Sequence, residues 1–109
     1  MSASKRKGDA FERAVVDELR SCGHVHVERG YRLGAHADRG DIDGLGGFLV
    51  ECKDCARFEL ASWLDEAVSE AEPSGAVPVL VVKRRRAPIA RAYVVMELRT
   101  FGRLIGGDS

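Results

Sequence analysis

Two acidic residues and a lysine stand in a short stretch of the chain whose pattern indicates a β-hairpin. The predicted strands cover 41–45 and 48–53, and they contain Asp41, Glu51 and Lys53. Side chains along a strand point alternately to its two faces, so Glu51 and Lys53 share one face. Whether Asp41 lies beside them depends on the turn between the two strands.

Two turns are compatible with the glycines in the middle of this stretch. A two-residue turn at Gly46-Gly47 would place Asp41 opposite Cys52, among apolar side chains. A three-residue loop pairs Asp41 with Glu51 instead, and such loops often end in a residue with positive φ, which glycine adopts readily. The hydrophobic pattern favours the second register, in which the acids and the lysine form one patch.

The chemistry of this patch follows from its charges. Carboxylates directly opposite each other on neighbouring strands have Cβ atoms about 4.5–5.5 Å apart, and like charges there repel. A divalent cation would relieve the repulsion, and carboxylate oxygens suit Mg²⁺, which also retains waters and binds phosphate oxygens. A lysine two residues after Glu51 would stabilise charge on a phosphate. The alternative is a solvent-facing hairpin with an ordinary glutamate–lysine pair.

The remaining elements would position this hairpin. Apolar residues at helical and at alternating spacing predict both helices and strands outside it. The strand at 77–83 is almost entirely apolar, so we expect it to be central and buried on both faces. The order of elements predicts an α/β fold with a mixed five-stranded sheet flanked by helices. The predicted helices cover 8–20 and 62–71, and the other strands 24–29, 77–83 and 91–98.

Length and composition restrict the class of protein. The chain has 109 residues, of which 45% are hydrophobic and 31% charged, as in a soluble protein. We expect a single domain over 1–109, with a flexible basic arm at 1–7 and a frayed tail at 105–109. No apolar run approaches the roughly 20 residues of a membrane span, and there is no secretory signal. Three cysteines are too few for a disulfide scaffold, which favours a cytoplasmic protein.

Opposite charges are separated along the chain although the formal net charge is zero. Residues 54–74 carry one basic and six acidic residues, whereas residues 75–109 carry seven basic and two acidic ones. A fold that gathers the basic residues on one side would bind a polyanion such as DNA, and solvated surface charge is the alternative. Arginines in the loop before Asp41 could hold phosphates beside a metal. The candidate DNA-binding residues are Lys5, Arg6, Lys7, Arg29, Arg32, His36, Arg39, Lys83, Arg84 and Arg85.

Other sequence patterns are weaker evidence for a functional site. Cys52 and Cys55 form a C-x-x-C pair, but a zinc site would need a second pair of ligands. The three histidines lack a metal-binding spacing. Trp63 lies in an apolar helical stripe, which favours a core or dimer contact over base stacking. No glycine-rich phosphate loop opens a helix, which argues against a nucleotide-binding enzyme.

Three segments together resemble the PD-(D/E)xK nuclease superfamily, namely 7–13, 39–42 and 49–53. Within that superfamily the chain resembles the archaeal-type Holliday junction resolvases and similar small resolvases encoded by phages. The resemblance covers roughly residues 5–104 and implies a restriction-endonuclease-like core. One departure is Gly40, which stands where the superfamily often has proline.

The resemblance also implies roles for individual residues. Asp41, Glu51 and the main-chain carbonyl of Cys52 would bind the metal, which is Mg²⁺ with Mn²⁺ able to substitute. Lys53 would be the catalytic lysine, and Glu12 would reach the same site from the first helix. The number of metal ions and the role of the extra acid at position 43 stay open.

These inferences predict a metal-dependent DNA endonuclease that resolves four-way (Holliday) junctions by paired symmetrical nicks, in DNA recombination or repair. Alternatives are a nickase, a repair or restriction nuclease acting on other DNA structures, and a non-catalytic DNA-binding protein of the same fold. We expect no small-molecule substrate and no membrane partner, and, for a phage protein, action in the cytoplasm of the bacterial host. Cutting two strands requires two sites, so we predict a symmetric homodimer. Its candidate contacts are Trp63, Leu64, Val68, Tyr93, Val95 and Phe101.

Overall fold

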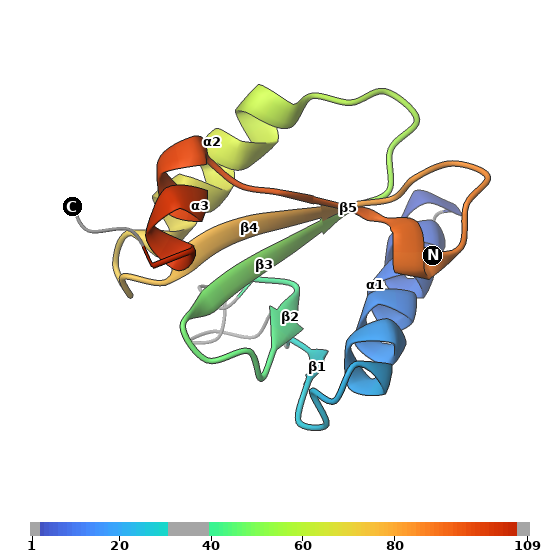
Figure 1. Ribbon diagram of the computed structural model, residues 1–109. Helices are drawn as coiled ribbons and strands as arrows, with labels where there is room; N and C mark the ends of the chain where they lie inside the picture. The colour runs from blue at the N-terminus through green and yellow to red at the C-terminus, as the bar shows by residue number, and fades with distance from the viewer. Residues whose placement is uncertain (1–2, 31–39, 107–109) are drawn as a thin grey trace.

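The computed structural model describes residues 3–30 and 40–106 (Figure 1). Among these residues, no helix combines the length and the apolar character needed to cross a membrane. The helices are α1 (Ala3–Ser21), α2 (Leu60–Ala71), the 3-10 helix η2 (Ile89–Arg91) and α3 (Leu98–Leu104). The strands are β1 (Glu28–Arg29), β2 (Ile42–Asp43), β3 (Phe48–Lys53), β4 (Val77–Val82) and β5 (Tyr93–Val95).

Within the described residues the five strands form one mixed sheet in the order β1-β2-β3-β4-β5. β3 and β4 pair in parallel, and every other neighbouring pair is antiparallel. A parallel pair needs a crossover connection, and α2 supplies it between β3 and β4. The predicted α/β fold with a mixed five-stranded sheet and a restriction-endonuclease-like core is confirmed.

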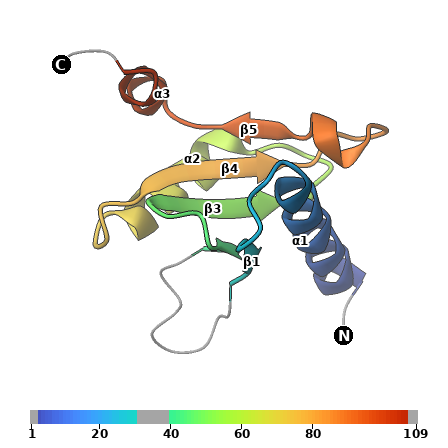
Figure 2. The same cartoon turned by 60° about the horizontal axis from the view of Figure 1, so that its bottom comes forward.

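The sheet is covered on both faces, and β3 contributes to both cores. Figure 2 shows α1 on one side of the sheet and α2 on the other. Val50 of β3 packs in the core below α1, whereas Leu49 packs in the core below α2. The first core consists of Phe11, Val15, Val16, Val27, Ile42 and Val50, and the second of Leu49, Trp63, Ala67, Ala71, Leu80 and Val82.

The first helix begins earlier than its apolar pattern predicts. α1 starts at Ala3, so residues 3–7 are helical where a flexible basic arm was expected. Gly8 lowers helix propensity by about 1 kcal/mol relative to alanine but does not end the helix. Lys7 forms an ion pair with Asp54 beyond the end of β3, and this contact favours the early start.

Two predicted strands are shorter than expected. Residues 24–27 form a turn, in which the N–H of Val27 donates to the carbonyl of His24, and only Glu28–Arg29 is a strand. The alternation of valines there was misleading because the chain reverses direction immediately after α1. The strand predicted over 91–98 is reduced to Tyr93–Val95, since η2 precedes it and α3 begins at Leu98.

Candidate active site

The hairpin has the predicted three-residue register. Ile42 pairs with Val50, which is the pairing that the longer loop requires. The N–H of Phe48 donates to the carbonyl of Leu45 at 3.1 Å, and Gly47 has the expected positive φ of 84°. The apolar faces of both strands therefore meet in the core below α1.

The pairing is distorted just before β2, where Asp41 lies in a bend. The N–H of Asp41 donates to the carbonyl of Val50 at 2.8 Å, which shifts the alignment by one residue relative to the Ile42 pair. Gly40 has a φ of +75°, and a Cβ built there would lie 2.7 Å from the same carbonyl oxygen. A proline cannot adopt this φ, so glycine at this position is a requirement of the local backbone.

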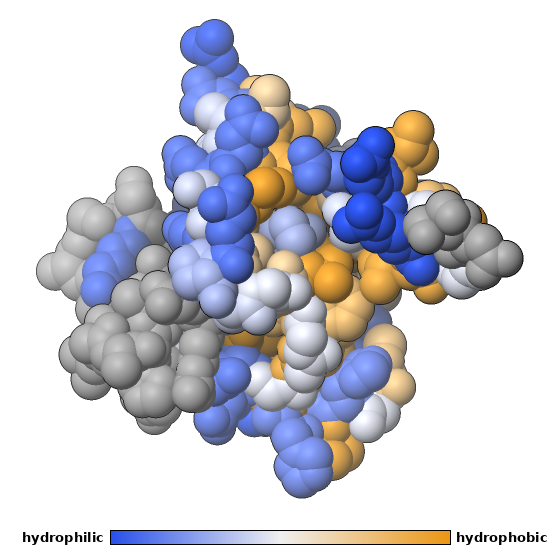
Figure 3. All heavy atoms as spheres, turned by 90° about the vertical axis from the view of Figure 1, so that its left-hand side faces the viewer, coloured by the Kyte–Doolittle hydropathy of each residue, from blue (hydrophilic) through white to orange (hydrophobic). Residues whose placement is uncertain are grey.

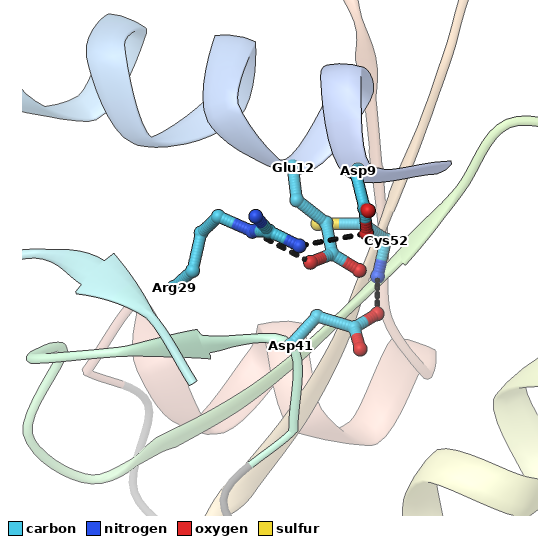
Figure 4. Close-up of polar contacts among 5 residues, drawn as sticks. All are labelled: Asp9, Glu12, Arg29, Asp41 and Cys52. Atoms are coloured by element: carbon cyan, nitrogen blue, oxygen red, sulfur yellow. Dashed lines mark hydrogen bonds and ion pairs between the residues drawn. The ribbon is translucent and has the colours of Figure 1, made fainter. Parts of the chain in front are cut away.

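Asp41 is the buried carboxylate of the site, with 3% of its surface exposed. Its Oδ2 accepts a hydrogen bond from the main-chain N–H of Cys52 at 2.7 Å (Figure 4). That N–H belongs to the peptide that links Glu51 to Cys52. The bend therefore replaces a direct cross-strand pair with a hydrogen bond that fixes the Asp41 carboxylate against the backbone of β3.

Glu51 and Lys53 lie on the α2 face of β3, and both are half-buried. The Lys53 ammonium lies 5.7 Å from the centroid of the Trp63 ring, within the range of a cation–π contact. Trp63 itself is buried in the core below α2, which resolves the earlier alternative of core or dimer contact in favour of the core. The core thus positions the end of the lysine side chain.

Glu12 lies on α1 and forms an ion pair with Arg29. Its Oε1 accepts from Nε of Arg29 at 3.1 Å, and Nη2 of Arg29 donates to Asp9 at 2.7 Å. In Figure 4 the carboxylates of Glu12 and Asp41 point toward the same space beside Cys52. Sequence reasoning placed Arg29 among the DNA-binding residues and missed this contact, since Asp9, Glu12 and Arg29 meet only through tertiary packing.

The oxygen donors at the hairpin meet part of what a divalent cation requires. Among residues 3–30 and 40–106, no group of three or more His, Cys, Asp or Glu side chains is arranged to hold a metal ion. The smaller set of Asp41, Glu51 and the Cys52 carbonyl fits in chemistry, because Mg²⁺ commonly takes one or two carboxylates and completes its shell with water and phosphate. Within the described part of the chain, Glu12 does not join them in a three-carboxylate group.

The extra acid of the hairpin has a local role. Oδ1 of Asp43 accepts from the N–H of Gly44 at 3.0 Å, which stabilises the start of the turn.

The thiols of Cys22 and Cys55 are exposed, whereas Cys52 packs against the core below α1 as its strand position predicted.

The candidate DNA-binding residues divide into groups. Lys7, Lys83 and Arg85 converge on Asp54, a residue that sequence reasoning did not single out. The guanidinium of Arg84 instead lies 5.8 Å from the centroid of the Tyr93 ring. Lys5 and Arg6 are exposed on α1. Arg32, His36 and Arg39 lie outside the described residues.

Comparison with known proteins supports a nuclease. A family model described as "Phage putative PDDEXK endonuclease" matches residues 3–104. No curated protein and no solved structure shows a significant match to the chain. Nucleases of the PDDEXK group generally use divalent metals, in agreement with the oxygen donors at the hairpin. Because the match covers α1, the hairpin and the whole sheet, the chain belongs to this family of phage endonucleases and to the PD-(D/E)xK superfamily.

Proposed function

We propose that the protein is a divalent-metal-dependent DNA endonuclease, using Mg²⁺ or Mn²⁺, that resolves four-way junctions. The observation that supports it most is the hydrogen bond between the buried Asp41 carboxylate and the peptide joining Glu51 to Cys52. This contact holds the acid of the bend before β2 against β3, the strand that carries Glu51 and, two residues later, Lys53. Family membership supports the nuclease chemistry, and the choice of junctions rests on the resemblance to small resolvases.

Each proposed site residue has its own role in phosphodiester hydrolysis. Asp41, Glu51 and the carbonyl of Cys52 would hold the metal, which when bound polarises the phosphate and lowers the pKa of a water. Lys53, held beside the Trp63 ring, donates hydrogen bonds to the phosphate oxygens that gain charge in the transition state. Glu12, oriented by Arg29, accepts a hydrogen bond from an O–H of the attacking water.

A homodimer would supply the second active site that paired nicks require. Within the described residues, α3 has no buried residue, and its apolar side chains face solvent. Figure 3 shows the side of the molecule on which α2 and α3 lie, where apolar residues are exposed between hydrophilic ones. We propose this surface as the dimer contact. It consists of Leu98, Phe101, Leu104 and Ile105 of α3 and its end. Of the predicted contacts, Leu64 and Val95 instead pack against the core below α2.

We further propose that residues 1–109 form one nuclease domain acting on DNA in the cytoplasm of a bacterial host.

One experiment tests the proposed junction-cutting activity. End-labelled four-way junction and a linear duplex of the same arm sequence are incubated with the protein in Mg²⁺, Mn²⁺ or EDTA. We expect paired symmetrical nicks in the junction alone, dependent on the metal. Equal nicking of the linear duplex would identify a nickase or another nuclease, and binding without cutting in either metal would identify a non-catalytic DNA-binding protein.

A further inference from the structure

A second buried carboxylate lies next to the proposed site, and it is surrounded by basic side chains. The Asp54 side chain is 2% exposed. Nη1 of Arg85 lies 2.7 Å from its Oδ1, and the ammonium groups of Lys7 and Lys83 each lie 3.7 Å from one of its oxygens. Three cations therefore face one anion, and this group of four residues is called the Asp54 cluster below.

The cluster is assembled from three segments that are distant in the sequence. Lys7 lies on α1, Asp54 follows the end of β3, and Lys83 follows the end of β4. The N–H of Lys83 donates to the carbonyl of Lys53 at 3.0 Å, which keeps the ends of the two parallel strands aligned. The residue after Arg85 has a positive φ of 56°, unusual for a residue other than glycine, so the chain turns sharply directly after the cluster.

The basic side chains of the cluster have N–H donors that Asp54 does not use and that a ligand could contact. The side chains of Lys7, Lys83 and Arg85 remain 47%, 42% and 37% exposed although each contacts Asp54. A lysine has three N–H donors and an arginine five, far more than one carboxylate can accept. The carboxylate therefore holds the three cations together against their mutual repulsion while leaving two positive charges in excess toward solvent.

We infer that Asp54 is a positioning residue that holds Lys7, Lys83 and Arg85 as one binding surface for DNA backbone phosphates. The inference rests on the proposed function, since it deepens how the substrate strand is held. Asp54 follows the last residue of β3, so the cluster lies at the end of the strand that carries Glu51 and Lys53. Arg84 is not part of this surface, because its guanidinium stacks on Tyr93.

A positioning role for Asp54 predicts the opposite change in DNA binding from the one usually expected when an acid near DNA is removed. Removing a negative charge from a phosphate-binding surface should tighten binding if charge alone matters. If Asp54 positions the cations, Asp54→Asn releases them to repel one another, and binding becomes weaker. The two outcomes differ in sign, so the direction of the change decides between them.

The test measures binding without cleavage. Fluorescence anisotropy of a labelled junction is recorded with the full chain in EDTA over a series of salt concentrations, because each phosphate contact contributes about 0.9 to the slope of log K against log salt. Lys7→Ala and Arg85→Ala should each reduce the slope by about one. Asp54→Asn should weaken binding and reduce the slope by about one or more. The matched control Arg103→Ala removes an exposed charge from α3, on the opposite side of the sheet from the start of α1 (Figure 1), and should leave the slope unchanged.

The outcomes separate this inference from the nuclease proposal. Unchanged slopes for Lys7→Ala and Arg85→Ala, or tighter binding by folded Asp54→Asn, would overturn the inference even if the protein cuts junctions. If the variants change the salt slopes as expected but the protein cuts no DNA, the result would support the phosphate-binding role of the Asp54 cluster and reject the proposed nuclease activity. Circular dichroism verifies that each variant is folded. If Asp54→Asn does not fold, unchanged slopes for the two single-cation variants would still overturn the inference.

Discussion

The carboxylate of Asp41 accepts a hydrogen bond from the main-chain N–H of Cys52, and this contact joins the bend before β2 to the strand that carries the other proposed site residues. The bond is 2.7 Å long and the carboxylate is buried. A buried charge is costly unless it is hydrogen-bonded, so the position is not an ordinary surface acid. The arrangement holds one carboxylate fixed while the Glu51 side chain on β3 stays half-buried.

Asp41→Asn should abolish cleavage with little loss of stability. The asparagine oxygen can still accept from Cys52, so the fold is retained, but the amide is a poor metal ligand. Junction binding in EDTA should persist or tighten, because one negative charge near the phosphates is gone. Cleavage of labelled junction in Mg²⁺, together with the melting temperature, measures both effects. Cutting at close to the wild-type rate would show that Asp41 is not a ligand.

Lys53→Met should separate the charge of this residue from its packing. Methionine keeps an unbranched side chain against Trp63, where sulfur also contacts aromatic rings favourably, so we expect a small change in melting temperature. The loss of the ammonium should slow cleavage by about 10²–10³-fold, as for the loss of one group that stabilises transition-state charge. Single-turnover rates on a labelled junction measure it. An unchanged rate would remove Lys53 from the mechanism.

The sequence was sufficient to predict the hairpin and both helices that cover the sheet. Alternation in β3 and the glycine at position 47 are local signals, and local signals determine the register. The bend at Asp41 was not predictable, because it depends on the positive φ of Gly40 and on its close approach to Val50. The burial of Asp54 was not predictable either, since its partners come from α1 and from the segment after β4.

Glu12→Gln tests whether the pair with Arg29 serves structure or turnover. The ion pair is partly exposed, so its loss should lower stability by only about 0.5–1 kcal/mol. If Glu12 orients the attacking water, the turnover number should fall far more than this stability change explains. Chemical denaturation and cleavage assays measure the two quantities. Asp17→Asn, an exposed acid on the same helix, is the control. Full activity in Glu12→Gln would leave the residue with a structural role alone.

Gly40→Ala should destabilise the protein more than a glycine substitution elsewhere in the same hairpin. A side chain at φ of +75° costs about 1–2 kcal/mol, and its Cβ would also lie 2.7 Å from the Val50 carbonyl oxygen. Gly46→Ala is the matched control, because nothing lies within 4 Å of its built Cβ. We expect the control to stay within about 0.5 kcal/mol of the wild type in denaturant unfolding. Equal losses in the two variants would contradict the strained geometry at Gly40.

Leu98→Glu tests the proposed dimer contact on α3. Leu98 is 83% exposed in the isolated chain, so a charge there should not unfold the monomer, but it would be buried unpaired in a dimer that uses this face. Light scattering at micromolar concentration should give about twice 11.9 kDa for the wild type and the single mass for the variant. Val25→Glu changes a similarly exposed apolar residue in the turn after α1 and should leave the dimer intact. On a four-way junction the monomeric variant should make single, unpaired nicks, because one chain supplies one site. A wild type that is monomeric both alone and on the junction would reject the dimer, and a dimer that persists in Leu98→Glu would place its contact on another face.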